Sequence, residues 1–249
     1  MPSSFKDHFS AHASAYAQYR PGYPDALFAY LASLCQARDL AWDCGTGNGQ
    51  AAHGLALHFT RIVATDASAD QIANAVPHPR IDYHVAPAAR APLEAHTADL
   101  VTVAQAIHWF DHDRFYAEVR RVLKPGGVLA AWTYGLPQIT PALNAVIERF
   151  YQDIVGAYWP PERRLVEARY RTIPFPFDEI QSPAFAMQLL WSLDDFLGYL
   201  GTWSATRRFI QGRGTNPVDQ VAEDLALAWG DPADGKTVRW QIYLRVGRL

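Results

Sequence analysis

Hydrophobic and polar positions alternate between two periodicities along the first half of the chain. Residues 24–37 and 50–59 carry apolar side chains at the spacing of one helix face. Short apolar runs lie between such stretches. The run at 99–106 is nearly all apolar, as a strand covered on both faces should be. Helical segments that alternate with buried strands predict a parallel α/β sheet with helices on both faces.

The second half of the chain departs from this alternation. Residues 137–183 hold one helical pattern and then a stretch rich in Pro, Arg and Tyr, which we interpret as an insertion after the fifth strand. A long connection then joins the last two strands. The full pattern predicts helices over 24–37, 50–59, 69–75, 115–123, 142–157, 194–204 and 218–229, and seven strands over 40–43, 62–65, 81–86, 99–106, 128–132, 185–191 and 238–246.

Composition narrows the class of protein. The chain has 249 residues, of which 49% are hydrophobic and 19% charged, so a disordered chain is excluded. Its 22 basic and 25 acidic residues give a net charge of −3, which provides no overall basic field for nucleic acid or a membrane. No apolar run is long enough to span a bilayer, the first residues do not resemble a signal peptide, and two cysteines cannot form a disulfide framework. We therefore expect one soluble, cytoplasmic domain over residues 1–249.

A glycine-rich segment follows the first predicted strand. Residues 43–49 read DCGTGNG and lead into a helix whose first N–H groups have no partner within the helix. Gly45 and Gly47 allow the backbone to turn tightly and to approach a ligand closely. Asp66 ends the second strand, 66 − 47 = 19 residues beyond Gly47, where a carboxylate can accept both ribose hydroxyls. The segment therefore predicts a nucleotide-containing cofactor, although an ordinary strand-to-helix turn would have a similar sequence.

Two details of this segment argue against a dinucleotide. The dehydrogenase fingerprint needs a sixth-position glycine, and Gln50 stands there. Asp43 would repel a pyrophosphate, whereas its carboxylate suits the ammonium group of S-adenosylmethionine.

In these segments the chain resembles the class I S-adenosylmethionine-dependent methyltransferases. Residues 43–49 are similar to the first motif of that family, Asp66 to the acidic end of its second strand, and 121–127 (RVLKPGG) to its helix-turn before strand five. The resemblance implies a Rossmann-like sheet of order 3-2-1-4-5-7-6 with strand seven antiparallel. Residues 19–24, 105–110 and 203–205 (YRPGYP, QAIHWF and WSA) are most similar to the small-molecule subgroup that contains trans-aconitate methyltransferase.

The resemblance also implies a role for each region of the chain. It makes 1–24 a flap over the cofactor, 25–135 the cofactor-binding half, 136–183 an inserted substrate lid and 184–249 the late strands and helices. A surface helix that packs its aromatic side chains on the domain is an equally good interpretation of 1–24. The implied cofactor-binding residues are Tyr19, Arg20, Asp43, Gly45, Thr46, Gly47, Asp66, Ala67, Gln71, Ala88 and Gln105. One departure is visible, because Ala89 stands where the family often has an acid that binds the adenine amino group.

The segment after the fourth strand should face the reacting methyl group, since ligands lie beyond the carboxyl ends of parallel strands. Plant carboxyl methyltransferases have a similar His-Trp here, which implies that Trp109 binds a substrate carboxylate; alternatively, Trp109 only caps the core. We expect His108 to be the catalytic residue, either as a general base or as a hydrogen-bond donor. We favour the donor, because a carboxylate is already ionised and needs no base. Tyr134 and Trp203 complete the predicted substrate contacts, and Phe175, Phe177 and Trp191 are expected to add apolar walls.

Two charged clusters have simpler interpretations. Four arginines in residues 162–171 form a largely solvated helix face, although one of them turned inward would bind an acidic substrate. The residues His108, Asp111, His112 and Asp113 could ligate a metal ion, but Asp111 is better explained as the N-cap of the next helix. We expect no metal.

The sequence therefore predicts a methyltransferase for a small molecule, by O-methylation of a carboxylic acid. Methylation of a hydroxyl, amine or thiol, of tRNA or of protein stays open, as does a non-catalytic module that binds S-adenosylmethionine. We expect no nucleic-acid or membrane partner, and the sequence does not indicate an oligomeric state.

Overall fold

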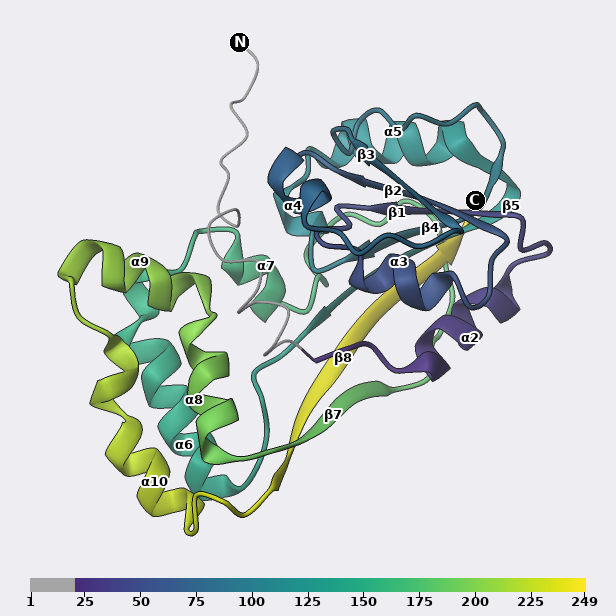
Figure 1. Ribbon diagram of the computed structural model, residues 1–249. Helices are drawn as coiled ribbons and strands as arrows, with labels where there is room; N and C mark the ends of the chain where they lie inside the picture. The colour runs from purple at the N-terminus through teal and green to yellow at the C-terminus, as the bar shows by residue number, and fades with distance from the viewer. Residues whose placement is uncertain (1–20) are drawn as a thin grey trace.

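A computed structural model describes residues 21–249 as a twisted sheet with helices on both faces and a separate group of helices at one end (Figure 1). The strand order is β3-β2-β1-β4-β5-β8-β6, and β7 pairs with β8 outside this path. The strands are β1 (Leu40–Cys44), β2 (Arg61–Asp66), β3 (Ile81–Val85), β4 (Ala98–Ala104), β5 (Leu123–Tyr134), β6 (Asp178–Glu179), β7 (Phe185–Trp191) and β8 (Lys236–Arg248).

The predicted sheet order is confirmed. Strands β1 to β5 are parallel to one another, and β8 is antiparallel to both β5 and β7. The predicted strands six and seven are β7 and β8, so their order 5-7-6 matches the observed β5-β8-β7. The structure adds one strand that the sequence did not predict, the two-residue β6, which pairs with the carboxyl end of β8.

The sheet is covered because its strands are apolar on both faces. In β4, every residue except the last is buried. Leu27 and Leu31 of one helix and Leu55 of another pack on one face, and Phe115 and Val119 pack on the other. Full burial of each large apolar side chain contributes about 1.5–3 kcal/mol. The helices are α2 (Asp25–Leu34), α3 (Gln50–Leu55), α4 (Ala69–Ala73), α5 (His112–Val122), α6 (Pro141–Arg149), α7 (Arg163–Glu167), α8 (Leu193–Gly201), α9 (Ser204–Arg213) and α10 (Ala222–Trp229), with 3-10 turns η1 (Ile107–Trp109), η3 (Gly156–Tyr158) and η4 (Pro217–Gln220) and a π-helical turn η2 (Phe150–Ile154).

Several predicted boundaries were wrong. The helix predicted over 115–123 begins at His112, because the Asp111 side chain accepts a hydrogen bond from the Arg114 amide and caps it. The loop predicted at 124–127 belongs to β5, since Leu123 already pairs with Ala98 across a shift in register. The helix predicted over 142–157 is divided into α6, η2 and η3, and α9 was not predicted at all.

Strand β8 carries the chain from the sheet to the group of helices. Its second half pairs with β5 from Ile242 onwards, and its first half pairs with β7 and, through a single bridge at Arg239, with Gln138. Helices α6, α8, α9 and α10 lie beside this extension, on the lower left of Figure 1. They therefore lie beyond the carboxyl end of β5, where a ligand of a parallel sheet is expected. Aromatic side chains join this group to the strands, since Tyr199 of α8 is in ring contact with Trp191 of β7 and Trp240 of β8.

In the part of the chain that the structure describes, no helix is long and apolar enough to cross a membrane.

Candidate active site

The glycine turn after β1 has three glycines with positive φ, and they have different neighbours. A Cβ on Gly45 would lie 2.6 Å from the Cβ of Ala106, and one on Gly49 would lie 2.2 Å from the hydroxyl of Tyr83. Among residues 21–249, a Cβ on Gly47 would meet only the side-chain oxygen of Gln71, at an ordinary contact distance of 3.7 Å. Gly45 and Gly49 are thus required by packing, whereas no described atom would clash with a side chain at Gly47. Gly47 marks the side of the turn on which a ligand can approach.

Asp43 lies one layer below this turn. Its carboxylate is fully buried and accepts hydrogen bonds from the hydroxyls of Thr46 (2.6 Å) and Thr102 (2.7 Å). Burial raises the pKa of Asp43 to about 6, although the two threonine hydroxyls oppose that increase. Asp43 therefore links the turn to β4 and places a negative charge under the loop at neutral pH.

Asp66 is held in a fixed orientation at the edge of the turn. One carboxylate oxygen accepts from the Gly47 amide and the other from the Ser68 amide, both at 2.9 Å. An ionised carboxylate has about four lone-pair positions, so both oxygens can accept further hydrogen bonds. Gln71 lies in α4, which begins two residues after the exposed Ala67. The predicted residues of the turn and of the end of β2 are thus brought together.

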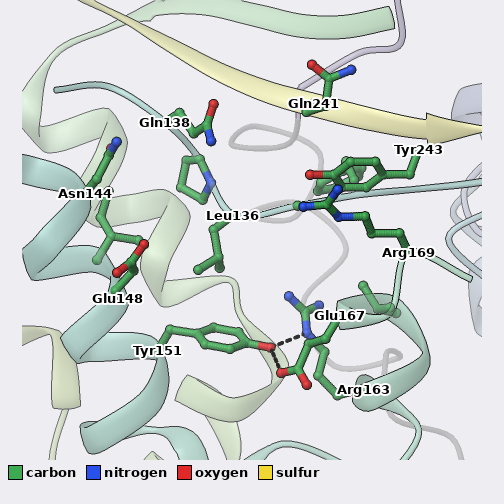
Figure 2. A pocket seen from close by; sticks show the side chains of 15 residues that line it. Leu136, Gln138, Asn144, Glu148, Tyr151, Arg163, Glu167, Arg169, Gln241 and Tyr243 are labelled. Atoms are coloured by element: carbon green, nitrogen blue, oxygen red, sulfur yellow. Dashed lines mark hydrogen bonds between the residues drawn. The ribbon is translucent and has the colours of Figure 1, made fainter. Parts of the chain in front are cut away.

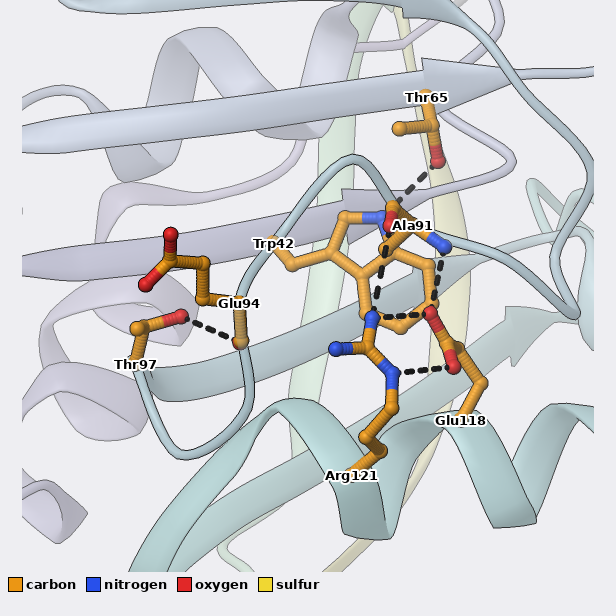
Figure 3. Close-up of polar contacts among 7 residues, drawn as sticks. All are labelled: Trp42, Thr65, Ala91, Glu94, Thr97, Glu118 and Arg121. Carbon is orange, nitrogen blue, oxygen red and sulfur yellow. Dashed lines mark hydrogen bonds and ion pairs between the residues drawn. The ribbon is translucent and has the colours of Figure 1, made fainter.

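The loop from β3 to β4, which carries Ala88, is fixed from below by α5 (Figure 3). The Ala91 amide donates to Glu118 at 2.6 Å, and Arg121 binds both oxygens of the same carboxylate at 2.8 and 2.6 Å. Burial raises the pKa of Glu118, but the hydrogen bonds from Arg121 and Ala91 outweigh it and leave the pKa below its ordinary value. Glu118 therefore stays ionised and holds the loop. Ala88 is partly buried and Ala89 is exposed.

A pocket of about 100 Å³ opens beyond the carboxyl ends of β4 and β5. Gln105, the first residue after β4, has a φ of +56°, and its side-chain oxygen accepts from the Thr133 hydroxyl at 2.7 Å. The predicted residues His108, Trp109, Tyr134 and Trp203 all line this pocket. Among its described lining residues there are two arginines, Arg163 and Arg207, and no aspartate or glutamate.

His108 is half-buried and has a defined partner on one side. Its Nδ1 lies 2.8 Å from the hydroxyl of Tyr170, and its ring lies against that of Trp109, with the centroids 4.7 Å apart. Burial and, to a smaller extent, the positive charge of Arg163 lower the pKa of His108 to about 3. The ring is therefore neutral at physiological pH.

Tyr170 reaches this position through an unusual backbone. Arg169 and Tyr170 have φ values of +58° and +59°, a conformation that costs a non-glycine residue about 1–2 kcal/mol. Arg245 of β8 stabilises the turn by donating to the carbonyl oxygens of Tyr170 (3.0 Å) and Ile173 (2.6 Å). The Tyr170 side chain is almost completely buried, and burial raises its pKa far above the ordinary value.

Arg163 separates this pocket from a larger cavity of about 270 Å³ and lines both (Figure 2). Its Nε donates to the Tyr151 hydroxyl at 2.8 Å, and its guanidinium lies 4.5 Å from the ring centroid of Trp159. Within residues 21–249, neither Nη group has a hydrogen-bond partner. Tyr151 donates in turn to Glu167 at 2.5 Å. These contacts hold the guanidinium in place.

Comparisons with known proteins place this chain in a family. Residues 42–131 match the methyltransferase domain family. A Dictyostelium discoideum protein named as a methyltransferase is 34% identical over 232 residues, which are 92% of this chain and 88% of that protein. The chain belongs to the class I S-adenosylmethionine-dependent methyltransferases.

Solved structures agree with this family. A structure described as a type II methyltransferase from Anaeromyxobacter dehalogenans is 47% identical and has a TM-score of 0.88, covering 92% of this chain and 98% of that one. A Haemonchus contortus N-methyltransferase, solved with S-adenosylhomocysteine, shares the fold at 20% identity and a TM-score of 0.51, covering 99% of this chain and 61% of that one. S-adenosylmethionine is the cofactor of this family.

The glycine turn of the methyltransferase fits this cofactor. Gly47 leaves space that a side chain would fill, and the Asp66 carboxylate is oriented beside it by two amides. Asp66 and Gln71 would hold the adenosine part. Asp43 would act on the ammonium group by its charge from below the loop, because its carboxylate is fully buried and is held by Thr46 and Thr102.

The sequence prediction of the site was partly wrong. Phe175 and Phe177 pack in the core around α5, and Trp191 packs in the core between β7 and α8, so none of them lines either cavity. Tyr19 and Arg20, and most of the flap predicted over 1–24, lie outside the described residues. The inward arginine expected in 162–171 is Arg163.

Sequence reasoning did not assign a role to Tyr170, Tyr151 or Thr102. Their hydroxyls act on His108, Arg163 and Asp43, which are distant in sequence, and no local motif marks them. Within residues 21–249, no three His, Cys, Asp or Glu side chains are grouped as metal ligands. The absence of a metal requirement stays a prediction.

Replacing Asp66 by alanine is expected to weaken binding of S-adenosylmethionine by about 1–3 kcal/mol, because the ribose hydroxyls and the Gly47 amide lose an acceptor. Isothermal titration calorimetry measures this change. The exposed Asp70 of α4 provides a control, since Asp70→Ala should leave the dissociation constant unchanged. An unchanged constant for Asp66→Ala would mean that the ribose binds elsewhere.

Proposed function

We propose that this methyltransferase methylates the carboxylate oxygen of a small organic acid. The observation that carries the proposal is the charge of the smaller pocket, which two arginines and no described carboxylate line. A cationic amine would be repelled there, whereas a carboxylate would be attracted. The similarity of residues 19–24, 105–110 and 203–205 to the trans-aconitate methyltransferase subgroup supports a small acidic substrate.

The side chains of the pocket suit an acceptor that needs no base. When bound, S-adenosylmethionine supplies a methyl group already activated by its positively charged sulfur. Arg163 attracts and orients the acid, and the neutral His108 donates a hydrogen bond to it. Trp109, which lies against His108, and Trp203 of the helical group exclude water that would weaken the nucleophile. Holding the reactants in line can itself contribute about 7–11 kcal/mol to lowering the barrier.

The larger cavity gives the rest of the acid a place to extend. The two cavities are adjacent, because four residues line both of them: Tyr134, Gly135, Leu136 and Arg163. Its walls add charged and amide groups, including Gln138, Glu148 and Arg169 (Figure 2). We expect no nucleic-acid substrate, because both cavities are small. Side chains from β5, α6 and α7 line the larger cavity, and side chains from β5, η1, α7, α8 and α9 line the smaller one.

A panel of small acids, phenols, amines and thiols with labelled S-adenosylmethionine tests the proposal. We expect labelled products from acids only, and these products should release the label in alkali, as methyl esters do. Arg163→Ala should lower kcat/KM for the acid by about 10- to 100-fold, mainly through KM, because a charge-assisted hydrogen bond contributes about 1.5–3 kcal/mol.

Arg164 provides the matched control. It is the next residue of α7, is exposed and lines neither cavity, so Arg164→Ala should keep normal kinetics. Labelled amines in place of esters would contradict the proposal, and so would equal effects of the two substitutions.

A further inference from the structure

We propose that Tyr170 is a positioning residue that holds His108 in its neutral Nε2–H tautomer, so that the ring donates from Nε2 into the substrate pocket. The inference deepens the proposed function, because it states how the histidine becomes a donor to an acid. It also applies to the protein without any substrate, since the two side chains already touch in the structure.

The argument begins with the contact between the two side chains. The Tyr170 hydroxyl and His108 Nδ1 are 2.8 Å apart, the distance of a well-formed hydrogen bond. One hydrogen lies between the two atoms, and it belongs either to the phenol or to the ring. A neutral imidazole has a single N–H. If the phenol donates to Nδ1, the ring proton is therefore on Nε2, and if Nδ1 donates to the phenol, Nε2 has no proton.

Burial favours the phenol as the donor. Tyr170 is 1% exposed, so water cannot accept a hydrogen bond from its hydroxyl. A phenol O–H that did not donate to His108 would lose this hydrogen bond and gain none from solvent. A phenol is a stronger hydrogen-bond donor than an imidazole N–H, and an imidazole nitrogen is a stronger acceptor than a phenol oxygen. The arrangement in which Tyr170 donates to Nδ1 therefore pairs the stronger donor with the stronger acceptor.

The hydroxyl of Thr133 also lies beside the Tyr170 phenol and offers it an alternative partner. Its hydroxyl proton is committed to the side-chain oxygen of Gln105 at 2.7 Å. The Thr133 oxygen would have to accept from Tyr170 for the opposite arrangement to form, with Nδ1–H then donating to the phenol. Nε2 would in that case carry a lone pair, which would repel a carboxylate.

The fold maintains this geometry at a cost in backbone strain. Tyr170 has a φ of +59° and Gln105 a φ of +56°, and these two residues flank His108 and Thr133 in the polar cluster. Strained residues of this kind persist where the surrounding structure requires them. Among the residues that the structure describes, the charged or titratable groups that line the pocket with His108 are Arg163, Arg207, Tyr134 and Tyr199, and none of these is a carboxylate that would favour a protonated ring.

Long-range ¹H–¹⁵N correlation spectra of the uniformly ¹⁵N-labelled protein, without cofactor or substrate, test the tautomer directly. The His108 signals are assigned by their loss in His108→Gln. We expect a protonated Nε2 and an unprotonated Nδ1, and we expect the pattern to persist to about pH 5, because burial and Arg163 lower the pKa of the ring. A protonated Nδ1 in the unmodified protein would overturn the inference.

Tyr170→Phe keeps the ring and removes the hydroxyl. In this variant the two nitrogen signals should move toward each other, because both tautomers become populated, and kcat/KM for the acid should fall about fivefold to tenfold. Tyr116→Phe is the control, since the Tyr116 hydroxyl donates to the carbonyl of Pro174 and does not touch His108. An unchanged His108 pattern in Tyr170→Phe would overturn the inference. The spectra do not depend on methylation, so a wrong substrate class would leave them unchanged and would appear only in the substrate panel.

Discussion

Replacing Asp43 by asparagine is expected to stabilise the free protein at neutral pH. The pKa of Asp43 is raised to about 6, so the folded state keeps the proton more strongly than the unfolded chain does. The contribution of this group to stability is therefore complete below its ordinary pKa of 3.8 and is lost as the pH rises through 6. A shift of about two units corresponds to about 3 kcal/mol, and Asp43→Asn should recover about 1–3 kcal/mol near pH 7.5. Urea denaturation as a function of pH measures this gain.

The same substitution should weaken cofactor binding. An asparagine amide can still bond to Thr46 and Thr102, but it brings no negative charge to the ammonium group of S-adenosylmethionine. We expect an affinity lower by about 10- to 100-fold, the effect of losing a partly screened attraction between two opposite charges. In the unmodified protein, affinity should increase as the pH rises through about 6, and the variant should lack this increase.

Asp99 is a matched control, since it is a buried aspartate in the neighbouring strand β4. Its carboxylate is paired with Lys124 at 2.7 Å and accepts from the Asp39 and Leu40 amides. Asp99→Asn should therefore destabilise the protein and leave cofactor affinity unchanged. If Asp43→Asn also destabilised the protein, the interpretation that burial of the ionised Asp43 side chain costs stability would be wrong.

The parts of the fold that the sequence predicted are those in which local pattern and burial coincide. Strand β4 is apolar at nearly every position because both of its faces are covered, and the glycine turn is marked by Gly45, Gly47 and Asp66. The order of the last two strands came from family resemblance, since nothing in residues 238–246 indicates an antiparallel partner.

The parts that were missed depend on contacts between distant segments. Tyr170 and His108 are 62 residues apart in sequence, and Thr102 and Asp43 are 59 apart. A left-handed turn at Tyr170 could not be predicted, because no glycine or asparagine marks it and Arg245 of β8 stabilises it from far along the chain. Three of the aromatic side chains expected in the pocket, Trp109, Tyr134 and Trp203, line it. Phe175, Phe177 and Trp191 pack against the core instead.

The residues of the smaller pocket come from segments that lie far apart in the sequence. His108 follows β4, Tyr134 ends β5, Arg163 begins α7 and Trp203 precedes α9. The long strand β8 brings these segments together, because it pairs with β5 in the sheet and carries the helical group beyond its edge. The lid predicted over 136–183 thus supplies one wall of the pocket, and residues after 191 supply another.

Two alanine substitutions in the glycine turn should separate folding from cofactor binding. Gly45→Ala places a Cβ 2.6 Å from the Cβ of Ala106 and 3.1 Å from the ring of Phe110, at a φ of +69°. The Cβ of Ala106 is attached directly to the backbone and cannot move aside as the end of a long side chain can, so we expect a loss of more than about 3 kcal/mol in the free energy of unfolding. Gly47→Ala has a similar φ of +57° but no described atom that would clash with the new Cβ, so only the backbone penalty of about 1–2 kcal/mol should appear.

For cofactor binding we expect the opposite ranking, with the larger effect in Gly47→Ala. The affinities are compared after correction for the fraction of each variant that is folded. The methyl group of Gly47→Ala points into the space in which the cofactor is expected, so affinity for S-adenosylmethionine should fall by more than about tenfold, the effect of overpacking a binding surface. Gly45→Ala points toward Ala106 instead, so its folded fraction should bind with an affinity closer to that of the unmodified protein. Chemical denaturation and calorimetry on the two variants give both quantities. Affinity retained in Gly47→Ala would show that the cofactor does not approach the turn at Gly47, and the site would then have to be placed on another face of the loop.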